Sequence, residues 1–315
     1  MDIVDPLGQA WALLEFLDGT RPYAEVIAAM LSAFPTLTAP DVAVGIARLD
    51  AAGLLDDASP CRFDTDPQLR RYVGNVNYFS HFCHATDRRG DHQEKLSQST
   101  ATLLGLGGGG STIIQLLAAI GIGAVVAVDH DRVDSTNLNR QLLFEEASVG
   151  RLKTEAARDL IARRNSVQEY RFVSAFVDSP SCVSKLIAGS TRGRVFSVIP
   201  RRSGCIDCLW LHYAGMDPRW ASRFRAFNSM QFRPPTLAFA PNLMRLCAEI
   251  VDEVVRILTN YLPPRSIGTQ LEVDFETGVT TSFLDWPRAE GCPTCGDGCE
   301  EDLAKLLGSP VLREP

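Results

Sequence analysis

A glycine-rich turn between an apolar strand and a helix constrains the fold of this 315-residue chain more than any other feature. Residues 103–131 read LLGLGGGGSTIIQLLAAIGIGAVVAVDHD, which is the order strand, glycine loop, helix, strand and acid. Glycines at such a turn let backbone N–H groups approach a phosphate, and the helix N-terminus adds partial positive charge. Asp129 ends the second strand, where an acid can hold a pair of ribose hydroxyls. The pattern predicts a nucleotide site without choosing the nucleotide.

Strands and helices alternate through the rest of the chain. Strands are expected at 100–107, 124–129, 169–177, 269–276 and 278–286, and helices from about 111, over 153–166 and over 240–262. Alternation of this kind is typical of an α/β fold with a doubly wound, Rossmann-like sheet.

The N-terminal residues 9–57 form a separate helical unit, with helices expected at 10–20, 23–34 and 41–55. Three short helices of this pattern are typical of a winged-helix-like module. Two interpretations stay open, a packing cap and a peptide-docking module. A polar stretch with two prolines at 58–70 marks the boundary. We therefore predict a module over 1–60, a linker and helical lead-in over 61–95, and an α/β domain over 96–315.

Charge and hydropathy exclude some classes of partner. The net charge is -7, and the chain has neither a basic block nor an apolar run of about 20 residues. We expect no nucleic acid or membrane partner and a cytoplasmic protein, in which nine cysteines require an explanation other than disulfides.

Four of the cysteines form two Cys-x-x-Cys pairs, Cys205 with Cys208 and Cys292 with Cys295. Each pair can place two thiolates on one face of a turn, and two such turns make a closed Cys₄ zinc site. The spacing predicts a structural Zn²⁺ that ties the end of the chain to the sheet. Cys299 does not fit a pair.

Polar residues after the second strand favour a triphosphate over a nicotinamide cofactor. Arg140 offers a planar fork for phosphate oxygens, and Lys153 offers a point charge. A hydride-transfer enzyme has no use for these two cations and Asn137 at this position.

These motifs together resemble the ubiquitin-activating-enzyme-like adenylyltransferases of the ThiF/MoeB type. The matching residues are Gly105, Gly107, Gly108 and Gly110, then Asp129, Asp131 and Val133, then Asn137, Leu138, Arg140 and Gln141, and finally Gly150 and Lys153. The resemblance implies that Asp129 holds the ribose and that Asn137, Arg140, Gln141 and Lys153 line the phosphates of ATP. It implies attack of a peptide C-terminal carboxylate on the α-phosphate, which gives an acyl adenylate and pyrophosphate. It also implies the Cys₄ zinc site.

Further segments indicate which branch of this family the chain resembles. The N-terminal module resembles PqqD-like leader-binding modules, and residues 227–248 and 70–82 resemble MccB-type peptide adenylating enzymes. The resemblance implies a ribosomally made precursor peptide as substrate, ATP with Mg²⁺, and a role in peptide antibiotic biosynthesis. It also implies a homodimer in which an arginine reaches the partner's nucleotide, and Arg71 is the candidate. Gly74 stands where such enzymes have a second arginine.

No cysteine lies in a context that favours thioester transfer. Residues 209–246 contain none, Cys247 lies in a predicted amphipathic helix, and Cys83 and Cys182 lack a reactive setting. We expect adenylation without a catalytic cysteine.

One part of the family pattern is missing. The family has a further strand that ends in an aspartate for Mg²⁺, yet no aspartate occurs between Asp178 and Asp207, and the gap centres on residues 190–194. Without that strand the sheet's edge is uncovered. Two explanations stay open: a segment is missing from the sequence, or the protein has lost it. The second would make the chain a catalytically silent leader-binding adaptor. A sulfur-carrier adenylyltransferase is a further alternative.

Overall fold

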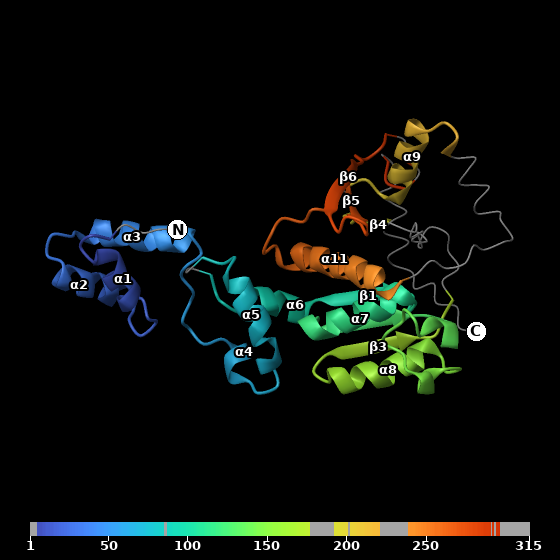
Figure 1. The fold of residues 1–315 in the computed structure, drawn as a ribbon, viewed down its shortest axis with the longest axis horizontal. Helices are drawn as coiled ribbons and strands as arrows, with labels where there is room; N and C mark the ends of the chain where they lie inside the picture. The colour runs from blue at the N-terminus through green and yellow to red at the C-terminus, as the bar shows by residue number, and fades with distance from the viewer. Residues whose placement is uncertain are drawn as a thin grey trace. The chain divides into compact units, whose positions relative to one another are not determined.

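The computed structural model describes residues 5–84, 87–176, 192–200, 202–220, 239–290, 292 and 294–296 (Figure 1). The chain divides into two compact units, Met1–Lys95 and Leu96–Pro315. Among the described residues, no helix combines the length and the apolar character that crossing a membrane requires.

The first unit begins with a small bundle of helices. These are α1 (Gln9–Phe16), α2 (Tyr23–Ala33) and α3 (Ala39–Ala51). Their apolar faces share a core of Leu13, Val26, Met30, Val42 and Ile46. Residues 5–84 contain no β-strand, so the described part of the module shows its helices but not the strands of a winged helix.

The start of α3 differs from the prediction. The helix begins at Ala39 and not at residue 41, and Pro40 lies in its first turn, where its missing N–H costs no hydrogen bond. Thr38 and Asp41 form a capping box at this end, in which the Asp41 carboxylate accepts from the Thr38 N–H at 2.8 Å.

The rest of the first unit is also helical. Its elements are α4 (Arg62–Thr65), the 3₁₀ helix η1 (Arg70–Tyr72), α5 (Val73–Ser80) and most of α6 (Asp91–Gln98). Phe63, Tyr72 and Val76 form a small buried cluster, in which the Phe63 and Tyr72 rings meet edge to face.

A parallel sheet forms the centre of the second unit and confirms the predicted α/β class. Its strands are β1 (Thr100–Leu104), β2 (Ala124–Val128) and β3 (Glu169–Val173), in the order β1-β2-β3. Helix α7 (Gly108–Ile120) connects the first two strands, and α8 (Lys153–Arg164) precedes the third. The carboxyl ends of all three strands therefore lie at one edge.

Helix α7 starts at Gly108, three residues before the predicted start at about 111. The weak helix propensity of glycine suggested a longer loop. Close packing overrides that preference, because a Cβ on Gly110 would lie 1.8 Å from the backbone oxygen of Gly105.

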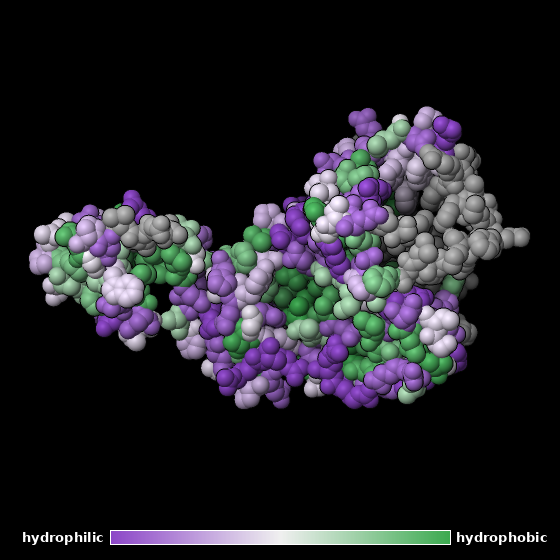
Figure 2. All heavy atoms as spheres, viewed as in Figure 1, coloured by the Kyte–Doolittle hydropathy of each residue, from purple (hydrophilic) through white to green (hydrophobic). Residues whose placement is uncertain are grey.

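A second sheet is antiparallel and has the order β4-β5-β6. Its strands are β4 (Arg192–Val195), β5 (Thr269–Asp274) and β6 (Thr280–Asp285). Helix α9 (Ile206–Met216) follows β4, and α11 (Ala240–Thr259) packs against both α7 and β4. Figure 2 shows hydrophobic residues gathered where α11 meets α7. The predicted amphipathic helix and the last two strands are confirmed.

The strand that the sequence seemed to lack is not found among the described residues. There, β1 pairs only with β2, and Leu104 at its end is 49% exposed. Residues 192–195 pair with β5 instead of β1. Residues 177–191, the rest of the region in question, lie outside the described part of the chain.

A buried carboxylate fixes the end of α11 to the segment before β5. Glu253 is 1% exposed. Its two oxygens accept from the backbone N–H groups of Arg265 and Ser266 and from the Arg265 guanidinium, all at 2.8–2.9 Å. Removing the carboxylate leaves buried donors without partners.

We expect Glu253→Ala to lower the free energy of unfolding by about 3–5 kcal/mol in urea denaturation. Glu290 is exposed, so Glu290→Ala serves as the control and should change stability by less than about 0.5 kcal/mol. Equal stability of the two variants would contradict the role given to Glu253.

Candidate functional site

The glycine loop after β1 has the geometry of an anion site. Gly105 has φ of 98°, a conformation that favours glycine, and Gly107 caps the N-terminus of α7 in an extended conformation. The first N–H groups of a helix have no partner within the helix, and they lie beside the positive end of its dipole. The segment from Gly107 to Gly110 therefore offers several backbone donors to an anion.

Asp129 connects this loop to the end of β2. Its carboxylate accepts from the Leu106 N–H at 2.5 Å and from the Asp131 N–H at 2.7 Å. The side chain is only 8% exposed, and the two donors compensate its burial. A carboxylate oxygen has more than one lone pair, so Asp129 can still accept from a hydroxyl group of a ligand.

Lys153, the first residue of α8, is paired with Asp131. The Lys153 Nζ atom lies 2.9 Å from Asp131 Oδ2, and the lysine side chain is 6% exposed. His130 Nε2 lies 3.3 Å from the other oxygen of Asp131. The hydrogen bond from Lys153 lowers the pKa of the Asp131 carboxyl below its ordinary value. The cation predicted to hold phosphate thus has a carboxylate partner at this site.

The remaining predicted phosphate ligands lie in the segment between β2 and α8. Arg140 donates to the Thr136 carbonyl at 2.7 Å and to Asn139 Oδ1 at 2.9 Å. Asn137 Oδ1 accepts from the Asp134 N–H at 3.2 Å. These contacts hold the side chains within their own turn.

Two observations relate this segment to the start of α7. The Cγ atom of Arg140 lies 3.8 Å from the position of a Cβ on Gly108, so the arginine lies beside the helix N-terminus. Gln141 is 3% exposed, and its Oε1 atom is buried without a hydrogen-bond partner. Buried polar atoms without partners are rare and occur at functional sites.

An open cavity of about 290 Å³ lies at the carboxyl ends of the three parallel strands. Its wall comes from Leu104, Gly105 and Gly107 at the end of β1, from 128–131 at the end of β2, and from Ala175 and Phe176 after β3. Four of the predicted site residues line this cavity: Gly105, Gly107, Asp129 and Asp131. Lys153 reaches this wall through Asp131, whereas Asn137, Arg140 and Gln141 do not line the cavity.

Three predicted or omitted residues need separate mention. Arg71 is exposed and belongs to the first unit. His130 and Phe176 line the cavity, but sequence reasoning missed them. The sequence signal for His130 is its position directly after the predicted strand 124–129, and Phe176 lies near the end of the predicted strand 169–177.

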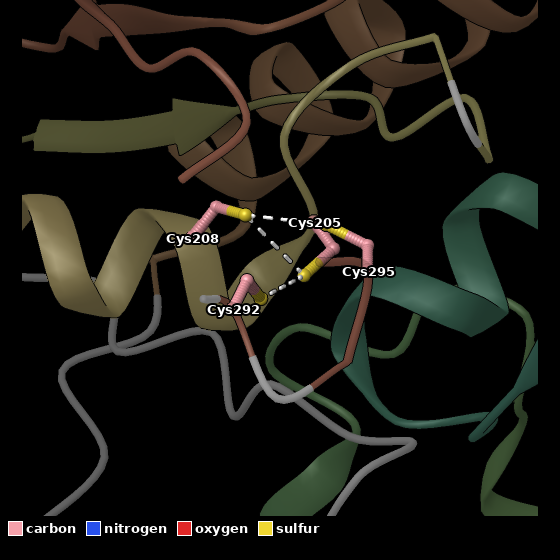
Figure 3. A group of neighbouring side chains, drawn as sticks. All are labelled: Cys205, Cys208, Cys292 and Cys295. Atoms are coloured by element: carbon pink, nitrogen blue, oxygen red, sulfur yellow. Dashed lines mark hydrogen bonds between the residues drawn. The ribbon is translucent and has the colours of Figure 1, made fainter. Parts of the chain in front are cut away.

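The four predicted zinc ligands come together in space (Figure 3). The sulfur atoms of Cys205 and Cys208 are 3.8 Å apart, those of Cys205 and Cys292 3.5 Å, and those of Cys208 and Cys295 3.3 Å. A tetrahedral Zn²⁺ with Zn–S bonds of about 2.3 Å spaces its sulfurs by about 3.8 Å. The donor set and its spacing therefore fit zinc.

The surroundings of the cluster also fit a structural metal. Burial raises the pKa of the Cys205 thiol, so thiolates here require a cation. The Ala289 N–H lies 3.3 Å from the Cys208 sulfur and can donate to a thiolate. Trp286 is 1% exposed and donates to the Cys205 carbonyl at 3.3 Å.

Two other described cysteines, Cys83 and Cys247, are buried. Burial raises the pKa of Cys247 to about 12 and also raises the pKa of Cys83, which disfavours a nucleophilic thiolate at either position. Cys182 and Cys299 lie outside the described residues. The expected absence of a catalytic cysteine stays a prediction.

Residues 81–189 match the model of the ThiF family. A molybdopterin-synthase adenylyltransferase of Salmonella typhimurium is 41% identical over 97 residues, which cover 31% of this chain and 39% of that protein. The SAMP-activating enzyme E1 of Haloferax volcanii is 39% identical over 98 residues, which cover 31% of this chain and 36% of that protein. The match thus spans less than two fifths of the length of either relative.

Similar solved structures extend over nearly the whole chain. E. coli MccB with AMPCPP and MccA superposes with a TM-score of 0.70 at 20% identity, and the match covers 94% of this chain and 92% of that one. PaaA superposes with a TM-score of 0.67 at 19% identity, with coverage of 90% and 92%. At this identity the likeness shows a shared fold.

We expect the purified protein to contain about one zinc per chain by elemental analysis and to lose it in Cys292→Ser. The loss should lower the free energy of unfolding by about 4 kcal/mol where free zinc exceeds its Kd a thousandfold. Cys61 lies outside the cluster, and Cys61→Ser should keep the metal. Zinc-free wild-type protein of unchanged stability would refute the site.

The ion pair at the cavity predicts a pH effect. Because the pKa of Asp131 is lowered, the stability that the pair contributes is complete above the ordinary value of 3.8 and is lost as the pH falls through the folded-state pKa. In Lys153→Met, which removes the ammonium, the Asp131 pKa should rise. Carboxyl ¹³C NMR titration of both proteins measures this, and identical titration curves would count against the pair.

Proposed function

We propose that this chain is an ATP-dependent adenylyltransferase that activates the C-terminal carboxylate of a ribosomally made precursor peptide. The match of residues 81–189 to the ThiF family model supports this reaction class. The observation that carries the proposal is the cavity at the strand ends, where a glycine loop, a buried acid and a lysine-carboxylate pair lie together. The adenylyltransferases among the sequence relatives also support the reaction class.

The reaction needs charge stabilisation more than acid-base groups. A carboxylate oxygen of the peptide attacks the α-phosphorus of ATP, and the bond to the β-phosphate oxygen breaks with release of pyrophosphate. Negative charge develops on the phosphate oxygens, where fixed cations and backbone donors are most effective. The backbone N–H groups of Gly107–Gly110 would hold these oxygens together with the side chains of Arg140 and Lys153. Asp129 would hold the ribose.

Phosphate binding by Lys153 requires a change of partner. The ammonium is held by Asp131, so a phosphate must compete with that carboxylate or share the lysine with it. Arg140 must likewise exchange its contacts with Thr136 and Asn139 for phosphate oxygens. Arg140 can make this exchange because its two acceptors are exposed and can accept hydrogen bonds from water instead.

Mg²⁺ would find oxygen ligands at the same cavity. Within the described residues, Asp129 and Asp131 carry the carboxylates there. Both oxygens of Asp129 accept backbone N–H groups, which favours Asp131 as the carboxylate for the ion. Mg²⁺ usually takes one or two carboxylates and completes its shell with water and phosphate oxygens.

The proposed substrate rests on the extent of the structural match. The fold of MccB, solved in complex with MccA, is shared over 94% of this chain, including residues outside the stretch that matches the ThiF model. We propose that the helical module of α1–α3 binds the leader of the precursor peptide, that the Cys₄ site holds a structural Zn²⁺, and that the protein acts as a cytoplasmic homodimer in which Arg71 serves the partner's nucleotide.

A second candidate substrate is a sulfur-carrier protein. The sequence relatives favour it, since those compared include a molybdopterin-synthase adenylyltransferase and a SAMP-activating enzyme. The third possibility, a silent leader-binding adaptor, gains support from β1, which lacks a second neighbour among the described strands.

ATP–pyrophosphate exchange separates these candidates. We expect exchange that depends on a precursor peptide and is absent when its C-terminus is amidated, because the amide cannot attack. Exchange that requires a sulfur-carrier C-terminus would favour the second candidate. Tight leader binding without any exchange would favour the adaptor and contradict an enzymatic role.

Replacement of the two cations tests the site. Arg140→Ala and Lys153→Met should each slow exchange by about 10²–10³-fold, because each removes a preformed charge from the developing phosphate charge. Arg163→Ala removes an exposed cation near the other end of α8 and should leave the rate unchanged. An unchanged rate in Lys153→Met would show that the phosphates bind elsewhere.

A further inference from the structure

Phe176 is an exposed aromatic residue at the wall of the cavity that also holds Asp129 and the glycine loop. Its side chain is 67% exposed, although it forms part of the cavity wall just past the end of β3. A large apolar ring in that position gains little from the rest of the fold. A ligand that covers it would bury apolar surface.

The ring of His130 holds Phe176 in a defined geometry. The two ring centroids are 4.7 Å apart, and the planes stand at 89°, an edge-to-face arrangement. His130 follows Asp129 directly, and its Nε2 atom is fixed beside Asp131 at 3.3 Å. One face of the wall beside the buried acid is therefore built from two aromatic side chains.

The strand order gives each part of a nucleotide its place. The glycine loop follows β1, Asp129 follows β2, and Phe176 follows β3, and the three parallel strands are neighbours in this order. In a nucleoside triphosphate the ribose separates the phosphates from the base. With phosphates at the glycine loop and ribose hydroxyls at Asp129, the base extends toward the end of β3.

We propose that Phe176, held by His130, is the platform on which the base of the bound nucleotide stacks. The inference rests on the proposed ATP site and adds to it two residues that determine affinity for the base. Stacking of a base on an aromatic ring tolerates different bases, because each base has a π-face. The platform thus contributes affinity for the nucleoside part and none for the phosphates.

Isothermal titration with Mg-ATP and with inorganic tripolyphosphate tests the platform. Phe176→Ala should weaken ATP binding by about 5- to 150-fold and leave tripolyphosphate binding unchanged. Phe176→Trp should keep the affinity for ATP, and ATP but not tripolyphosphate should quench the added indole emission. Phe283 is an exposed phenylalanine on β6, and Phe283→Ala serves as the matched control that binds ATP like the wild type.

A double-mutant cycle tests the positioning role of His130. As a single change, His130→Ala should weaken ATP binding. In the Phe176→Ala protein the same change should have no further effect, since His130 then has no ring to hold. His130→Phe keeps an edge-to-face partner and should restore the affinity. Additive losses in the double variant would overturn this role.

The outcomes distinguish the platform from the enzymatic proposal. Equal ATP affinity of wild type and Phe176→Ala, or equal losses for ATP and tripolyphosphate, would overturn the platform while leaving exchange activity as evidence for the enzyme. ATP binding that depends on Phe176 in a protein without exchange would support the platform and contradict the enzyme. A wild-type protein that binds no ATP would overturn both.

Discussion

The hydrogen bonds of the Asp129 carboxylate are the constraint on which the candidate site depends. They join the loop after β1, through Leu106, to the turn after β2, through Asp131. The Lys153 N–H then donates to the Asp131 carbonyl at 2.9 Å, which connects the same turn to the start of α8. One buried acid thus holds three segments that are remote in sequence. Because it is charged and nearly inaccessible, it is stable only with both backbone donors in place.

Local patterns predicted the elements around this acid well. The β1–α7–β2 unit and the long helix α11 follow from hydrophobic periodicity and from the glycine turn, which are properties of neighbouring residues. The start of α7 was predicted too late, because Gly110 is selected by its contact with the Gly105 backbone and not by helix propensity. The pairing of the four-residue strand β4 with β5 could not be predicted, since it depends on contacts between distant parts of the chain.

Within the site, residue types were easier to predict than their partners. The spacing of Asp129, Arg140 and Lys153 indicated an anion site, and the structure places Asp129 on the cavity wall. The sequence did not reveal that Lys153 is paired with Asp131, because that pair forms only when the start of α8 lies against the turn after β2. The contact of His130 with Phe176 is of the same kind, since it joins the ends of two neighbouring strands.

The cysteine cluster has a consequence for how such a chain can diversify. Cys205 and Cys292 are 87 positions apart, so a bound metal would close a long loop that contains α11 and the β5–β6 hairpin. The entropic cost of closing a loop grows only with the logarithm of its length, and ten added residues would change it by about 0.1 kcal/mol. Segments between the two Cys-x-x-Cys pairs can therefore lengthen, shorten or be exchanged with little effect on the strength of the closure.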